Sequence, residues 1–175
     1  KVIRLLLERR ASFALIGGVR FGGTITIDSA WELGFDHIAL CMGAGRPTVI
    51  DMPNALARGV RTASDFLMAL QLSGAEKKDS IANLQVRLPI VVIGGGLTAI
   101  DTATESLAYY PIQVEKFLSR YEVLVKDRGE QGARLGWGPE DTEIAEEFII
   151  HAKAIREERK KAKPDVVALL ENWGG

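Results

Sequence analysis

The stretch Leu88–Ala103, LPIVVIGGGLTAIDTA, joins an apolar run of β-branched residues to three glycines and then to a helix-forming pattern. Ile90–Ile93 is predicted to be a strand, because short apolar β-branched runs are typical of strands buried in a parallel sheet. Leu97–Tyr109 is predicted to be the helix that follows. A strand, a turn and a helix in this order are typical of an α/β fold, so this stretch decides the expected fold class.

The glycines at the junction fit the dinucleotide-binding pattern G-x-G-x-x-A. The first glycine allows a tight turn, the second lets the backbone approach a pyrophosphate, and the final alanine lets the helix pack against the strand. The helix N-terminus then offers free N–H groups and a partial positive charge to the anion. The pattern predicts nucleotide binding; the alternative is that the glycines only turn the chain within a packed α/β domain. The residues concerned are Gly94, Gly95, Gly96, Leu97, Thr98 and Ala99.

The rest of the chain alternates strand-like and helix-like segments before it becomes wholly helical. Helices are predicted over residues 2–15 and over Thr62–Leu72, and His37–Met42 and parts of Val19–Ile27 are predicted to be strands. For Thr62–Leu72, Thr62 or Ser64 is the expected cap, and Gly74 is the expected C-terminal glycine. Pro139 is expected at the first position of a later helix. Pro111 is expected to break or restart its helix, at a cost of ~3 kcal/mol. Beyond it, apolar stripes at helical spacing predict helices. These stripes are Val114, Phe117, Leu118, Tyr121 and Val125; Ala145, Phe148, Ile149, Ala152 and Ile155; and Val166, Leu169, Leu170 and Trp173.

Composition excludes several classes of partner and site. The 22 basic and 23 acidic residues leave a net charge of −1, so no broad basic face for nucleic acid is expected. Cys41 is the only cysteine, which excludes an internal disulfide and favours a cytoplasmic location. No apolar run approaches the ~20 residues that span a membrane. His37 and His151 lack the spacing of metal ligands, so no metal site is predicted.

Three segments resemble the small (β) subunit of glutamate synthase and related flavoproteins. Val91–Asp101 is similar to that family's V-V-I-G-G-G-N-T-A-x-D turn, and Gly59–Leu67 is similar to its G-V-x-x-A-x-D-F-L. Ile38–Pro47, IALCMGAGRP, resembles the family's crossing from the FAD domain to the NADPH domain. The likeness covers residues 17–105, with Leu97 in place of the family's asparagine.

The resemblance implies an oxidoreductase that passes hydride from NADPH or NADH to FAD and electrons onward to a further acceptor. It implies a partial Rossmann-like three-layer fold with parallel strands, followed by an all-helical C-terminal segment. No catalytic side chain is assigned, because the cofactors carry the chemistry. The glycine turn would face the NADPH pyrophosphate. A second set would lie near FAD or the interdomain crossing: Gly43, Ala44, Gly45, Arg46 and Pro47.

The chain lacks the family's own FAD-binding glycine motif, so this piece is expected neither to hold FAD nor to turn over. Its opening on Lys1 suggests a part of something longer. The remaining FAD-domain segments and an electron-acceptor subunit are the expected partners, with no nucleic acid and no membrane. The expected parts are an FAD-domain piece, a crossing segment, a strand-turn-helix and a helical insertion or tail. They span residues 1–50, 51–88, 89–110 and 111–175. The alternative function is a non-catalytic nucleotide-sensing or protein-interaction module.

Overall fold

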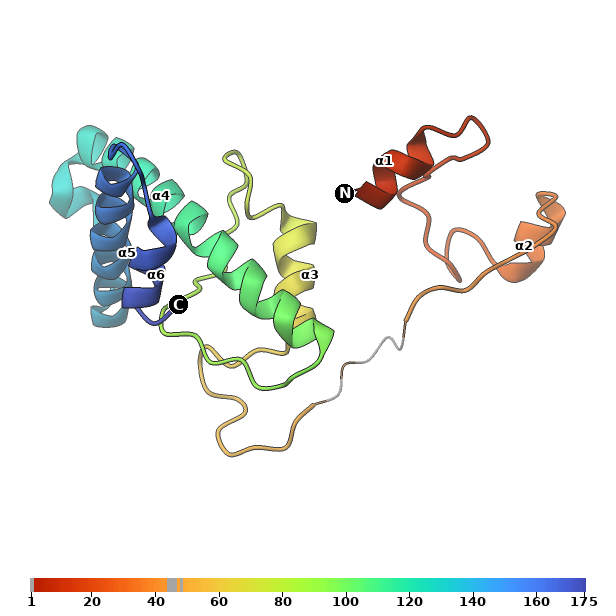
Figure 1. Ribbon diagram of the computed structural model, residues 1–175, viewed down its shortest axis with the longest axis horizontal. Helices are drawn as coiled ribbons and strands as arrows, with labels where there is room; N and C mark the ends of the chain where they lie inside the picture. The colour runs from red at the N-terminus through yellow and green to blue at the C-terminus, as the bar shows by residue number, and fades with distance from the viewer. Residues whose placement is uncertain (1, 44–46, 48) are drawn as a thin grey trace. The chain divides into compact units, whose positions relative to one another are not determined.

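A computed structural model describes residues 2–43, 47 and 49–175 of the chain (Figure 1). The chain divides into two compact units, residues 1–46 and residues 47–175. The regular secondary structure of the described residues consists of six helices, two in the first unit and four in the second.

The first unit has short helices and little core. Helix α1 spans Val2–Glu8 and helix α2 spans Ile27–Glu32. Thr26 begins α2 as its N-cap, and its hydroxyl accepts a hydrogen bond from the N–H of Ser29 at 3.2 Å. Among the side chains described in this unit, Ala30 is the buried one. The unit therefore buries too little apolar surface to account for its own stability.

Helix α3, Ala63–Ser73, follows the local sequence signals closely. The Thr62 hydroxyl caps it by accepting from the N–H of Asp65, and Gly74 ends it in the left-handed conformation at φ 57°. Phe66 and Leu70 are buried, and they pack with Ala75 and Tyr109 in a small cluster. Of the two expected caps, Thr62 and Ser64, Thr62 is the one used, and the predicted C-terminal glycine is confirmed.

Helix α4 is the longest element and runs from Leu97 to Ala133, with a non-helical Gly129 inside it. The prediction that Pro111 breaks this helix is wrong. Pro111 lies within α4 and is buried, as are its neighbours Tyr110 and Val114, which are both fully buried. The burial of this helix face offsets the cost of the missing proline N–H, which is about 3 kcal/mol.

Helices α5, Pro139–Glu158, and α6, Val166–Asn172, complete the main core with α4 (Figure 1). Pro139 stands at the first position of α5, as its sequence predicts. Phe148 is 1% exposed and meets Tyr110 and Phe117 edge to face, with ring centroids 6.2 and 5.7 Å apart. The predicted stripes form this core. Its buried members are Tyr110, Val114, Leu118, Tyr121, Ile144, Phe148, Ile149, Ala152, Ile155 and Leu170.

The α/β prediction is wrong. The residues described contain no strand, only an isolated bridge between Phe21 and Ile25. Ile90–Ile93 and His37–Met42 have no regular secondary structure. A strand needs a neighbour to pair its backbone, whereas a helix satisfies its own, and these two runs find no neighbour among the described residues. The Rossmann-like sheet is therefore absent from the part of the chain that the structure describes.

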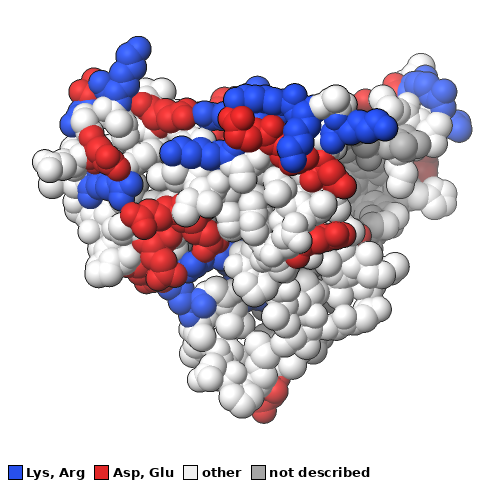
Figure 2. Space-filling view, turned by 60° about the vertical axis from the view of Figure 1, so that its left-hand side comes forward, with Lys and Arg blue, Asp and Glu red and all other residues white. Residues whose placement is uncertain are grey.

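The described helices include none that is both long and apolar enough to cross a lipid bilayer. On the face drawn in Figure 2, basic and acidic side chains intermingle along one edge rather than forming a field of one sign. Eleven ion pairs join described residues of opposite charge. Most are exposed, so each contributes little to stability.

Candidate functional site

The glycine turn has part of its predicted local geometry. Gly94 adopts φ 140°, which favours glycine, and a Cβ placed on it would meet the Ala99 side chain at 3.4 Å. Gly96 is the N-cap of α4, and its carbonyl accepts from the N–H groups of Ala99 and Ile100 at 3.0 and 3.2 Å. The predicted residues from Gly94 to Thr98 are exposed. The turn and the helix start are where the sequence places them.

The turn lacks the sheet that would make it a dinucleotide site. No strand precedes Gly94 in the described chain, so the pyrophosphate would meet only an exposed helix N-terminus. A helix N-terminus attracts anions in general and does not by itself select a nucleotide. Binding of NADPH or NADH at Gly94–Ala99 stays a prediction.

The residues predicted to lie near FAD fall where the chain passes from the first unit to the second. Gly43 is exposed at φ 65°, and Pro47 is half-buried in the other unit. Ala44, Gly45 and Arg46 lie outside the described residues. The prediction that these five residues lie near FAD or the interdomain crossing therefore stays a prediction.

A polar cluster that the sequence did not predict lies beside the helical core. The Tyr110 hydroxyl is 2.6 Å from Nδ1 of His151 and 3.4 Å from Oε1 of Glu147. Arg87 donates to Glu147 at 2.5 Å and to Glu143 at 3.0 Å. The cluster ties the segment before Ile90 to α4 and α5. It joins residues far apart in the sequence, so no local pattern could have revealed it.

The protonation states in this cluster follow from burial and pairing. Burial and the neighbouring Glu147 raise the pKa of Tyr110, which therefore stays a hydrogen-bond donor. Burial lowers the pKa of His151, with Glu147 opposing it, so the neutral imidazole is favoured. The ring of His151 also stacks on Trp173 at the end of α6, with centroids 3.8 Å apart. This arrangement positions helices rather than a substrate.

Two further α4 side chains hold the polypeptide between α3 and α4. The ammonium of Lys116 donates to the carbonyl oxygens of Ala75 at 2.5 Å and Ala82 at 3.0 Å. The Gln113 amide donates to the Val86 carbonyl at 2.8 Å and accepts from the Val86 N–H at 2.9 Å. Gln113 thus pairs with Val86 as a neighbouring strand would. Both residues have a structural role.

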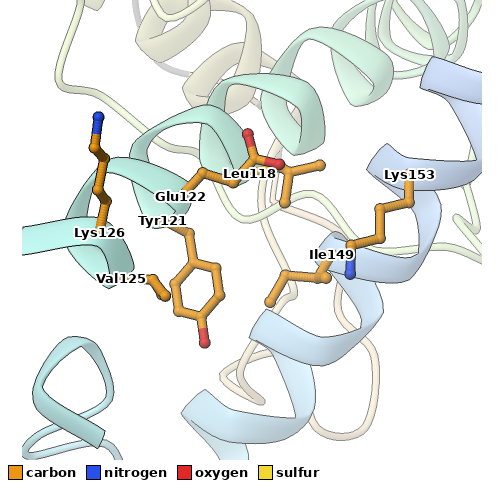
Figure 3. A pocket seen from close by; sticks show the side chains of 7 residues that line it. All are labelled: Leu118, Tyr121, Glu122, Val125, Lys126, Ile149 and Lys153. Atoms are coloured by element: carbon orange, nitrogen blue, oxygen red, sulfur yellow. The ribbon is translucent and has the colours of Figure 1, made fainter. Parts of the chain in front are cut away.

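A groove between α4 and α5 forms a cavity of about 280 Å³ (Figure 3). Its lining combines four apolar or aromatic side chains with three charged ones: Leu118, Tyr121, Glu122, Val125, Lys126, Ile149 and Lys153. Leu118, Tyr121 and Ile149 are buried members of the core. Sequence stripes predict the two helices but not which residues meet across them, so the groove could not be predicted.

Comparison with known proteins finds a relative that matches nearly the whole of this chain. The chain is 50% identical over 174 residues to Uncharacterized protein RP006 of Rickettsia prowazekii (strain Madrid E). The match covers 99% of this chain and 23% of that protein, so the chain spans about a quarter of the length of this curated relative. No family model matches the chain. No solved structure matches it either.

These findings correct the functional interpretation. The described fold is helical without a sheet, and the relative's name states no activity. The identification as a flavin-dependent oxidoreductase like the glutamate synthase small subunit is therefore wrong, and with it the expected enzyme activity. The alternative, a nucleotide-sensing or protein-interaction module, finds no support either.

Groups of three or more histidine, cysteine, aspartate or glutamate side chains suited to a metal ion do not occur among the described residues. Cys41, which belongs to the run His37–Met42 that was predicted to be a strand, is exposed. His37 and His151 belong to different units.

Proposed function

We propose that residues 47–175 form a structural subdomain of a longer protein, which packs on the rest of that protein through an apolar segment, Ile90–Ile100. The exposure of this segment beside a well-packed helical core carries the proposal. Val91 is 83% exposed and Leu97 81% exposed. Ile93 and Ile100, at 59% and 56%, add to the same segment. Burying each such side chain contributes roughly 1.5–3 kcal/mol, so a covering surface would be strongly favoured.

The backbone of this segment supports the same proposal. No described residue makes a backbone–backbone hydrogen bond with positions 89–95. Ile90 and Val92 are half-buried, while Val91 and Ile93, which alternate with them, are exposed. Exposed β-branched side chains next to unpaired N–H and C=O groups can pair with another strand. Proteins usually cover such an edge with a further part of the structure. The partner that this proposal names is the remainder of the same polypeptide.

The length of the relative supports a partner within the same chain. The Rickettsia protein matches this chain along 23% of its own length, so three quarters of it lies outside the match.

A cytoplasmic location is part of the proposal, because the one cysteine, Cys41, offers no internal disulfide. Nucleic acid is not among the proposed partners, since the net charge is −1.

Hydrogen exchange tests the proposal. The 175-residue chain is compared with the product of the whole reading frame that encodes it. We expect the amides of Val91–Gly95 to be protected about tenfold or more in the longer protein, because covering the segment makes local opening rarer. Equal exchange in the two proteins would contradict the proposal, as would a reading frame that encodes no further residues.

Paired lysine substitutions provide the matched control. Val91→Lys places a charge within the proposed contact surface, whereas Val167→Lys places one on α6, where Val167 is 63% exposed. In the longer protein, Val91→Lys should remove the added protection of Val91–Gly95 and Val167→Lys should leave it intact. Loss of protection in both variants would show a general destabilisation instead.

A further inference from the structure

The groove between α4 and α5 combines an apolar floor with cationic side chains at its rim (Figure 3). Leu118 and Val125 of α4 and Ile149 of α5 supply the floor. The cavity of about 280 Å³ is at the lower end of the size range of small-molecule sites, so it suits a ligand of roughly ten non-hydrogen atoms. The apolar floor favours an aliphatic or aromatic group.

The acidic side chain at the rim is already neutralised. Both carboxylate oxygens of Glu122 accept hydrogen bonds from Arg156, at 2.8 and 3.2 Å. This pairing lowers the pKa of Glu122, which therefore stays ionised and bound to Arg156. Glu122 thus contributes no unpaired negative charge to the groove.

The two lysines at the rim remain available. No carboxylate of the described residues lies within ion-pair distance of Lys126 or Lys153. In Figure 3 the Lys153 side chain runs down α5 toward Ile149, while Lys126 extends from the α4 side away from the cavity. Arg156 and Lys153 both act on the charge of Glu122, so cationic side chains outnumber the one carboxylate at this rim. The electrostatic complement of this rim is an anion.

We propose that this groove binds an amphipathic monocarboxylate, with its apolar tail on Leu118, Val125 and Ile149 and its carboxylate paired with Lys153. The apolar floor of the groove favours an apolar tail on the ligand, and the unpaired ammonium of Lys153 favours a carboxylate as its head group. A ligand of this size gains only a few contacts, so we expect a dissociation constant on the order of 1 mM. This site is independent of the surface at Ile90–Ile100.

A titration followed by amide chemical shifts tests the site, with octanoate as the probe and octanol as its uncharged counterpart. Octanoate should shift the amides of residues 118–126 and 149–153 and bind about tenfold more tightly than octanol. Lys153→Gln should remove most of this preference, and Lys126→Gln should reduce it less. Lys160→Gln is the matched control. Lys160 lies beyond the end of α5 and pairs with Glu157, so its substitution should leave the preference for octanoate unchanged.

Three outcomes would overturn the proposal. The first is equal affinity for octanoate and octanol, or an unchanged preference in Lys153→Gln. The second is shifts confined to residues outside the groove. The third is a concentration-dependent dimer, detected by sedimentation, that the groove-filling Val125→Phe abolishes, because the groove would then join two copies of this chain. The charge variants lie at exposed positions, so they test the site without unfolding the core.

Discussion

The helical pair α4 and α5 and the segment Ile90–Ile93 are both rich in apolar residues, yet only the helices bury theirs. Phe148 and Leu118 are each 1% exposed, whereas Val91 is 83% exposed. A helix satisfies its own backbone, so its apolar stripe needs only another surface to cover it. A β-branched run also needs a second strand, and the described chain supplies none. Apolar composition therefore predicts burial only where the hydrogen-bonding partner is local.

The largest expected effect comes from truncating the core. Phe148→Ala removes a ring that packs against Tyr110 and Phe117, and the cavity left behind should cost about 3–5 kcal/mol of unfolding free energy. Urea unfolding followed by circular dichroism measures this loss. The paired variant Val91→Ala should change the stability of the 175-residue chain by less than about 0.5 kcal/mol. Similar costs at both positions would contradict the contrast between the two regions.

An intermediate effect is expected where the two regions join. Gln113→Met keeps the shape of the side chain but leaves the N–H and C=O of Val86 without their partners. Because Gln113 is fully buried, we expect a loss of about 1–3 kcal/mol and faster exchange of the Val86 amide. Gln131→Met, at an exposed position of α4, is the control. If Val86 exchanges at the same rate in both variants, Gln113 does not hold this segment.

Local signals predicted the elements that depend only on nearby residues. Thr62 and Gly74 bound α3 as predicted, Pro139 starts α5, and the glycines precede the start of α4 at Leu97. Each of these features is decided within one turn of helix. The prediction at Pro111 was wrong because tertiary burial around Tyr110 and Val114 outweighs a local cost.

The sequence could not predict the arrangements that depend on distant partners. The Ile90–Ile93 run has strand propensity, but propensity says nothing about whether a second strand is present. The glycine pattern predicted the turn at Gly94 correctly but the fold around it wrongly. The same turn can precede a helix whether or not a sheet is present. The groove and the Tyr110–His151 contact join α4 to α5, and only the packing of the two helices defines them.

The smallest expected effect is a pH dependence that arises in the packed helices and not in the exposed segment. Burial lowers the pKa of His151 in the folded chain below its unfolded value of about 6.5. The unfolded state therefore binds the proton first as the pH falls, and the free energy of unfolding should decrease below about pH 6.5. Glu147, on the same helix and itself paired with Arg87, acts on the charge of His151, while Tyr110 and Trp173 contact its ring.

A protonated His151 can no longer accept the Tyr110 hydroxyl, which must then donate to Glu147 across 3.4 Å. Urea unfolding at pH 7.5, 6.5 and 5.5 should show the decrease in the unaltered chain, within a range of roughly 1 kcal/mol. His151→Asn keeps an acceptor near the Tyr110 hydroxyl and should flatten the profile, while His37→Asn, at an exposed position, should not. An identical slope in His151→Asn would place the titrating group elsewhere. The flattened profile would instead show that the contact between α4 and α5 at Tyr110 is where acid first weakens the fold.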